Sequence, residues 1–298
     1  MKRSTHEDYR QRIQRVLSHL QRHLDEAIAP ADLAGIACFS PHHFHRIFRG
    51  MVGESVMQHV RRLRLERAAM RLKHGDRAVT AIAFEAGYEA HEAFTRAFGE
   101  RFGCAPTEFR ARHRPVAWPA AANDIHYRDD GAVDDFVPVE GGSRLEVELR
   151  ERSPRRVAVV RRIGPYAEVG EAFDELMQWA VPRGFLTPAS EILGRCYDDP
   201  DLTAADRIRF EACVTVAADV RGEGAIAIDE IPGGTYATAF HVGPYAELGE
   251  AYLALFGRWL PASGREPRPG PCVERYLNDP DSTEPEELET EIAVLLEP

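Results

Sequence analysis

Apolar residues in the first 115 positions recur at the spacing of amphipathic helices. Between residues 8 and 24, Ile13, Val16, Leu17 and Leu20 lie on one face and basic side chains on the other. Similar patterns predict further helices over 33–38, on both sides of Gly87, and after Gly103. The opening third of the chain is therefore predicted to be all-α.

One arrangement occurs twice in this region. Apolar periodic residues flank Gly87, which predicts two short helices joined by a tight turn. Glycine suits such a turn because positive φ costs a residue with a Cβ about 1 kcal/mol. The earlier copy has Cys38 at the turn, and the pattern F-x-R-x-F follows both turns, at 44–48 and at 94–98. Two helix-turn-helix motifs are predicted.

A long helix is predicted between the two motifs, from Val56 to Leu72. Seventeen residues give it a length of roughly 25 Å. Helices held apart by a rod of that length approach the spacing of about 34 Å between successive major-groove openings of DNA. The two motifs are therefore expected to read two adjacent major grooves.

Charge is divided unevenly along the chain. Residues 1–115 carry a net charge of +7 and the remainder −18, which together make the overall −11. A basic half suits a polyanion such as DNA, whereas an acidic half suits a different partner.

Helical periodicity ends near Pro115. The segment 114–142 is rich in Pro, Gly, Ala and Asp and is predicted to be a partly extended linker. Its aromatic residues Trp118, Tyr127 and Phe136 are candidates for docking on one of the domains.

The acidic half contains short alternating strands and a second repeat. The segment 163–173, IGPYAEVGEAF, returns 79 residues later at 242–252 as VGPYAELGEAY. Each copy reads strand, Gly-Pro turn, helix, strand, strand. Residues 143–298 are therefore predicted to form an α+β domain built from two pseudo-twofold-related strand-helix-strand-strand repeats around a central groove.

Residues 10–113 resemble the DNA-binding domain of AraC/XylS-type transcription regulators. The likeness rests on the doubled motif with F-x-R-x-F, the long connecting helix, and the ending G-x-x-P-x-x-F-R at 103–110; it places this domain at 1–113. By position it implies base-reading roles for His42, His45, Arg46, His91, Glu92, Thr95 and Arg96. Arginine suits the O6/N7 edge of guanine and glutamate suits cytosine N4. Contact with phosphate or solvent is the alternative for each residue.

Residues 143–298 resemble the gyrase-inhibitor-like effector-binding domain of multidrug regulators. The matching segments are the twin GPYAE sequences, W-L-P-x-S-G at 259–264 and the stretch 271–280. The resemblance implies a groove that holds lipophilic, often cationic, molecules between aromatic walls over a carboxylate. The residues it implies are Glu274 as the carboxylate and Tyr166, Tyr245, Trp259 and Tyr276 as the walls, with packing alone as the alternative for the walls.

Together the two resemblances predict a one-component transcription regulator that binds promoter DNA, senses a small molecule, and acts with RNA polymerase as either a monomer or a dimer. It is not expected to be an enzyme. One alternative is that the C-terminal domain hydrolyses a reactive small molecule, with Glu274 as general base. The other is that this domain sequesters drugs without regulating genes.

The sequence predicts neither a metal site nor another cofactor. His42, His43 and His45 point in different directions on a helix or lack a third ligand. The five cysteines are widely spaced and contain no C-x-x-C pair, so no disulfide framework is predicted. The polar start and the absence of long apolar runs predict a cytoplasmic protein with no membrane partner.

Overall fold

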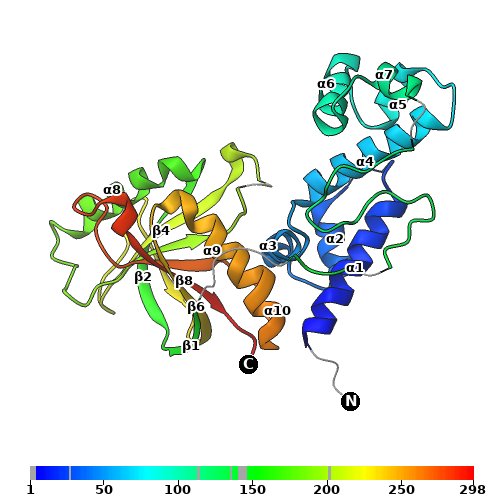
Figure 1. Cartoon of the computed structure of the whole chain (residues 1–298). Helices are drawn as coiled ribbons and strands as arrows, with labels where there is room; N and C mark the ends of the chain where they lie inside the picture. The colour runs from blue at the N-terminus through cyan, green and yellow to red at the C-terminus, as the bar shows by residue number, and fades with distance from the viewer. Residues whose placement is uncertain (1–4, 27, 113–114, 135, 140–145, 201–202) are drawn as a thin grey trace. The chain divides into compact units, whose positions relative to one another are not determined.

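The computed structural model describes residues 5–26, 28–112, 115–134, 136–139, 146–200 and 203–298 (Figure 1). Its contacts form two compact parts: Glu7–Pro41 with Met51–Glu140, and His42–Gly50 with Gly141–Pro298. Each part has hydrophobic clusters of its own. No helix within the described residues combines the length and apolar character needed to cross a membrane.

The first third of the chain is helical, as predicted. Its helices are α1 (Thr5–Arg22), α2 (Pro30–Ala37), α3 (Pro41–Val52), α4 (Val56–Lys73), α5 (Val79–Glu85), α6 (His91–Phe102) and α7 (Pro106–Ala111). Ser55 begins α4 with a capping box, in which its side chain accepts from the Gln58 N–H and the Gln58 side chain accepts from the Ser55 N–H.

Left-handed backbone occurs at both predicted turns. Gly87 has φ +84°, and Cys38, at the end of α2, has φ 54° and ψ 38°. The N–H of Cys38 is directed at the carbonyls of Ala34 and Gly35, which closes the last turn of the helix. A side chain at such a position costs about 1 kcal/mol relative to glycine.

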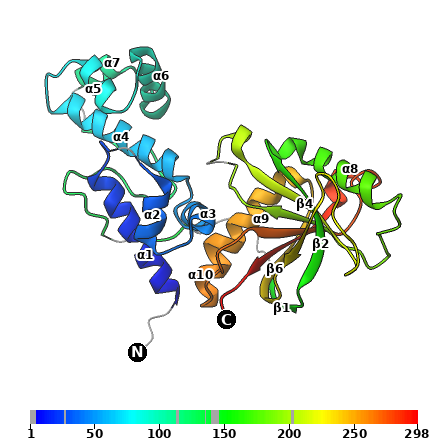
Figure 2. The ribbon, with the colours of Figure 1, turned by 180° about the vertical axis from the view of Figure 1, so that it is seen from behind.

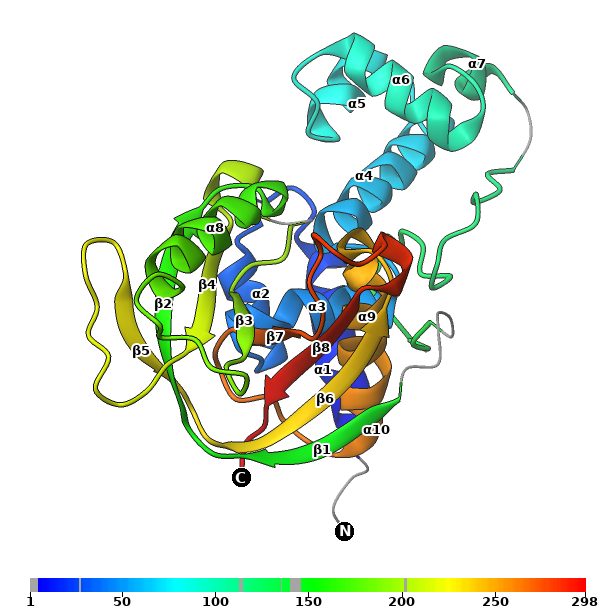
Figure 3. The ribbon, with the colours of Figure 1, turned by 90° about the vertical axis from the view of Figure 1, so that its left-hand side faces the viewer.

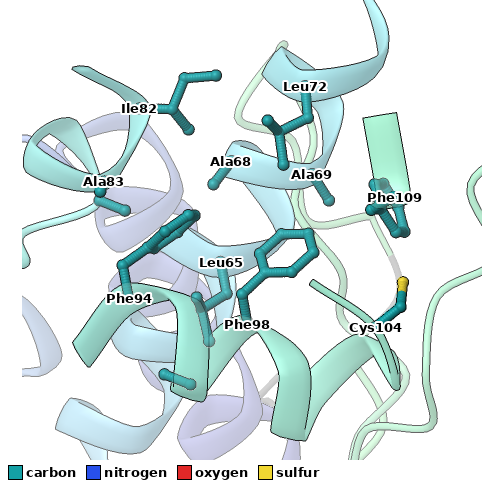
Figure 4. Packing of buried hydrophobic residues seen from close by; sticks show 12 residues of the cluster. Leu65, Ala68, Ala69, Leu72, Ile82, Ala83, Phe94, Phe98, Cys104 and Phe109 are labelled. Atoms are coloured by element: carbon teal, nitrogen blue, oxygen red, sulfur yellow. The ribbon is translucent and has the colours of Figure 1, made fainter. Parts of the chain in front are cut away.

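The core formed by α4 to α7 is aromatic at its centre (Figure 4). Phe94 and Phe98 of α6 are fully buried, with ring centroids 5.5 Å apart. Phe109 of α7 meets Phe98 nearly edge-on at 5.2 Å. Ala83 of α5 is also buried, and its small side chain lies close to Phe94 in Figure 4. The phenylalanines of the second F-x-R-x-F motif therefore anchor α6 to the rest of the core.

Residues 115–134 and 136–139 of the predicted linker 114–142 lie on the helical part in an extended conformation. The rest of that predicted linker lies outside the described residues. Asn123 Nδ2 donates to the Val52 carbonyl at 2.7 Å, and the Val139 N–H donates to the Met51 carbonyl at 2.9 Å. Phe136 is fully buried. This segment is therefore bound along much of its length through its own backbone and side chains.

Glu66 of α4 connects this segment to two helices. The side chain is fully buried, and its Oε1 accepts from Arg62 Nη1 at 3.2 Å, Arg101 Nη2 at 2.9 Å and His126 at 3.1 Å. Its Oε2 accepts from the Tyr127 N–H at 2.9 Å. One carboxylate thus joins α4, α6 and the extended segment.

The acidic half contains an eight-stranded antiparallel sheet of order β1-β6-β8-β7-β3-β4-β2-β5, seen strongly bent in Figure 3. The strands are β1 (Val147–Arg152), β2 (Arg155–Ile163), β3 (Ile192–Cys196), β4 (Arg209–Thr215), β5 (Ala227–Ile231), β6 (Gly234–Val242), β7 (Cys272–Tyr276) and β8 (Glu289–Leu295). The strand order is symmetrical about the central β7–β3 pair. On the two sides of that pair, β8 occupies the position that corresponds to β4, and β6 the position that corresponds to β2.

Helices follow each Gly-Pro-Tyr segment after a short 3-10 turn, Tyr166–Glu168 or Tyr245–Glu247. Helix α8 (Val169–Ala180) packs on β2 and β4. Helix α9 (Leu248–Ala254) lies beside β6 and continues through a π-helical turn, Leu255–Trp259, into α10 (Leu260–Ser263) (Figure 2). The predicted combination of an all-α region with an α+β domain is confirmed.

Candidate effector site and DNA-reading helices

Glu274 lies at the centre of β7 and is only 6% exposed. Its carboxylate accepts hydrogen bonds from the Tyr252 hydroxyl to Oε1 and from the Tyr276 hydroxyl to Oε2, both at 2.7 Å. Burying a carboxylate without such donors is costly, because the group loses its hydration. Neither donor carries a charge, so these two bonds orient Glu274 without neutralising it.

Burial raises the pKa of the Tyr252 and Tyr276 hydroxyls well above its usual value, and the neighbouring Glu274 raises it further. Both hydroxyls therefore keep their protons at physiological pH.

A chain of aromatic contacts extends from Tyr276. Its ring lies 5.5 Å from Tyr245 and 5.4 Å from Phe173, both close to edge-on. Phe173 in turn meets Phe210 at 5.7 Å, and Phe210 meets Tyr166 at 6.0 Å. The three tyrosines predicted as walls thus belong to one set of contacting rings.

Trp259 is placed differently. It is the last residue of the π-helical turn after α9 and is partly exposed. Within the described part of the chain, no ring contact or hydrogen bond joins Trp259 to these tyrosines or to Glu274. The structure therefore groups three of the four predicted walls and leaves Trp259 apart.

Strand register makes room for the Tyr276 hydroxyl. Gly194 of β3 is the cross-strand partner of Glu274. A Cβ at Gly194 would lie 2.8 Å from the Tyr276 hydroxyl oxygen and 3.0 Å from the Phe210 ring. A side chain at residue 194 would therefore displace the ring that holds Glu274.

Sequence reasoning missed three members of this cluster, Phe210 of β4 and the pair formed by Phe173 of α8 and Tyr252 of α9. The signal for that pair was nevertheless available, because the 79-residue repeat aligns Phe173 with Tyr252 at the ends of the two copies. Aromatic residues at equivalent places in both copies lie at equivalent places on the two helices that cover the sheet.

On α6, the predicted base readers lie away from the core. Glu92 and Arg96 are exposed, and His91 and Thr95 are partly exposed, with Thr95 Oγ1 3.4 Å from His91 Nε2. Phe94 on the same helix is fully buried. One face of α6 is thus anchored while its early turns remain open, as a helix that enters the major groove requires.

On α3, the predicted base readers differ in exposure. His42 and His45 are partly exposed, whereas Arg46 is only 6% exposed. Residues 42–50 belong to the same compact part as the α+β domain. There the Arg46 guanidinium lies 4.2 Å from the centroid of the Tyr252 ring, and its Nη1 lies 2.7 Å from Cys272 Sγ.

Among the residues that the structure describes, no group of three or more His, Cys, Asp or Glu side chains could hold a metal ion. His43, between the two partly exposed histidines of α3, is 1% exposed and stacks on Phe256 at 5.3 Å. The histidines of α3 therefore do not converge on one point.

Comparison with known families agrees with this division of the chain. Residues 145–297 match the GyrI-like small molecule binding domain, and residues 33–112 match a helix-turn-helix domain.

Curated relatives match one part or the other. The uncharacterized HTH-type transcriptional regulator YbfP of Bacillus subtilis (strain 168) is 36% identical over 102 residues, which are 34% of this chain and 35% of YbfP. The DNA gyrase inhibitor of Enterobacter lignolyticus (strain SCF1) is 32% identical over 155 residues, 50% of this chain and 97% of that protein. The probable transcriptional regulator YgiV of Escherichia coli (strain K12) is 31% identical over 125 residues, 41% of this chain and 78% of YgiV.

The chain thus spans about a third of YbfP and nearly the whole gyrase inhibitor. The GyrI-like match alone extends over 145–297, more than half of the residues. This chain belongs to the GyrI-like family and joins that small-molecule binding domain to an AraC-type helix-turn-helix DNA-binding region.

Proposed function

We propose that this transcription regulator reads two adjacent major-groove segments of promoter DNA and responds to a lipophilic organic cation that binds beside Glu274. The observation that carries the effector class is the environment of Glu274. It is a buried carboxylate held by two neutral tyrosine hydroxyls and bordered by aromatic rings.

An organic cation that leaves water must have its lost hydration replaced. The faces of aromatic rings and a partly buried carboxylate supply that replacement, because both attract positive charge. Tyr166, Tyr245 and Tyr276 supply the proposed rings, and Tyr252 orients the carboxylate. Trp259 is proposed as an outer wall that a larger ligand would reach.

The DNA-reading side of the proposal rests on α6, whose polar residues His91, Glu92, Thr95 and Arg96 lie on early turns opposite a buried phenylalanine face. On α3, His42, His45 and Arg46 are proposed to read the second groove once Arg46 is exposed. The proposed partner of the promoter-bound protein is RNA polymerase, since a transcription regulator acts by changing how often that enzyme initiates transcription.

The effector class is tested by titrating the full-length protein with tetraphenylphosphonium, a cation, and triphenylphosphine oxide, which is neutral. Glu274→Gln is expected to weaken binding of the cation at least tenfold, about 1.4 kcal/mol, and to change binding of the neutral compound little. Glu250→Gln, on the exposed surface of α9, is the matched control. Equal losses of affinity for both compounds would contradict the proposal that the charge of Glu274 binds the cation.

The DNA role is tested with an operator selected from random DNA by the full-length protein. Arg96→Ala is expected to weaken binding to that operator by about 1–3 kcal/mol and to relax the base specificity at one operator position. Arg112→Ala, an exposed arginine after α7, serves as the control. If no sequence is selected, sequestration of small molecules is the better description. Turnover of an electrophile that stops with Glu274→Gln would establish the hydrolase alternative.

A further inference from the structure

The aromatic surroundings of Glu274 already hold a cation from the protein itself. The guanidinium of Arg46 lies 4.2 Å from the centroid of the Tyr252 ring, whose hydroxyl donates to Glu274. Arg46 Nη2 donates to the Asp198 carbonyl at 3.4 Å, and the Tyr166 hydroxyl donates to the same carbonyl at 2.9 Å. Arg46 therefore contacts the group of residues proposed to bind the effector.

The chemistry of this contact is that of the proposed ligand. Guanidinium is a planar, weakly hydrated organic cation that binds readily to aromatic faces. Arg46 lies over Tyr252 and also 5.7 Å from the Phe256 ring, and it is only 6% exposed. A lipophilic cation and Arg46 would therefore use the same surfaces.

The neighbouring residues of α3 are closely fitted to the same domain. His43 stacks on Phe256 at 5.3 Å, and its Nε2 lies 3.1 Å from the Arg268 carbonyl oxygen. Gly50 and Gly257 bring two helix backbones together, because a Cβ built on Gly257 would lie 2.4 Å from the Gly50 Cα. The segment 42–50 thus packs in a specific position, and the contacts of Arg46 are part of that packing.

Arg46 cannot reach a guanine edge from this position, because a side chain that contacts bases must be free to enter the major groove. An effector cation bound on these rings and a base contact by Arg46 both require Arg46 to leave Tyr252. The effector cation and DNA therefore both favour the state in which Arg46 has left Tyr252 over the state in which it lies on that ring. This difference in affinity between two states is what allosteric coupling needs.

We propose that Arg46 is an internal competitor of the effector: it occupies the aromatic surface beside Glu274 and withholds α3 from DNA until a lipophilic cation displaces it. The inference rests on the proposed function and adds the direction of coupling to it. Effector and operator DNA then strengthen each other's binding.

The first test measures tetraphenylphosphonium affinity in the full-length protein. Arg46→Ala removes the competitor and is expected to raise the affinity at least fivefold, within the usual range of allosteric coupling. The control variant is Arg112→Ala, which removes an exposed arginine outside both proposed sites and is expected to leave cation affinity as in the wild type.

The second test leaves every proposed base reader in place. Gly257→Ala adds a Cβ that meets the backbone of Gly50 and is expected to unseat α3. Affinity for tetraphenylphosphonium and affinity for the operator should both rise. Gly249→Ala is the control, since nothing lies within 4 Å of a Cβ at that glycine of α9.

The outcomes separate this inference from the proposed function. Unchanged or weaker cation binding in both Arg46→Ala and Gly257→Ala would overturn the competition, and so would weaker operator binding by the wild type at saturating tetraphenylphosphonium. If Glu274→Gln still weakens cation binding selectively, the proposed effector class survives that result. If neither the wild type nor Arg46→Ala binds the cation, the competition and the effector class fail together.

Discussion

Replacing Glu66 with alanine tests how the helical part is held together. Glu66 is fully buried and accepts four hydrogen bonds, from Arg62, Arg101, His126 and the Tyr127 N–H. Glu66→Ala removes the acceptor that these donors share and a negative charge from beside two arginines, which keep hydrogen bonds to the carbonyls of Ile125 and Pro119.

The magnitude follows from the exposure of the groups left behind. Arg62 is 7% exposed and keeps Glu54 as a charged partner, with Arg62 Nη2 2.5 Å from Glu54 Oε1. Arg101 is less buried, with 19% of its side chain exposed, and regains part of its hydration. Breaking a buried charge network usually costs 3–5 kcal/mol, and the partial exposure of Arg101 places the expected loss near the lower end, about 3 kcal/mol.

The assay is urea unfolding followed by the fluorescence of Trp118, which stacks on His126 with a centroid distance of 5.8 Å. The chain has three tryptophans, so Trp179 and Trp259 are first replaced by phenylalanine. Glu108→Ala is the control. Its carboxylate is 58% exposed and pairs with Arg112, so a loss of at most about 0.5 kcal/mol is expected.

A loss of stability below about 1 kcal/mol for Glu66→Ala would refute the reasoning, because removing one partner from a buried charge network destabilises a protein by more than that. A loss of the expected size with an unchanged Trp118 signal would show that the extended segment is held independently of Glu66.

Three further predictions concern single positions. Cys38→Gly should stabilise the protein by about 0.5–1 kcal/mol, because Cys38 has φ 54°; a thermal melt that shows destabilisation would contradict this. Gly194→Val should displace Tyr276 and weaken tetraphenylphosphonium binding about tenfold or more, whereas Gly170→Ala, in open space, should not; equal affinities would show that the ring does not hold Glu274. Burial lowers the pKa of His43 from its usual 6.5 to about 4, so between those values the unfolded imidazole binds a proton that the folded one does not, and stability should fall on acidification through that window by up to about 3 kcal/mol. Urea midpoints at pH 7 and pH 4.5 should differ less in His43→Phe than in the wild type. The same pH dependence in both proteins would show that a group other than His43 causes it.

Local patterns predicted the elements well where one face of an element is buried. Helix α4 was predicted over 56–72 and is found at Val56–Lys73 because a repeated apolar stripe and the Ser55 capping box are both local. The edge strand β5, Ala227–Ile231, was not predicted. Most of its residues are exposed, so its sequence, AIDEI, lacks the apolar alternation of a half-buried strand.

The candidate site was predicted in part for the same reason. Glu274 and three tyrosines follow from family motifs, and the repeat offset contains the information that would have added Phe173 and Tyr252. Gly194 had no signal of its own, because its role depends on which residue of β7 lies opposite it. Strand register is a property of the assembled sheet.

The sequence by itself determined the kinds of domain, their order, the two repeats and the residue types available for DNA and for a cation. Those features depend on periodicity, turn chemistry and charge, which act over a few neighbouring residues. Only the tertiary structure decided that the segment 115–134 is bound to the helical part through Glu66 and that Arg46 lies on Tyr252. These contacts join residues far apart in the chain, and whether they form depends on complementary shape and charge between surfaces that exist only after each element has folded.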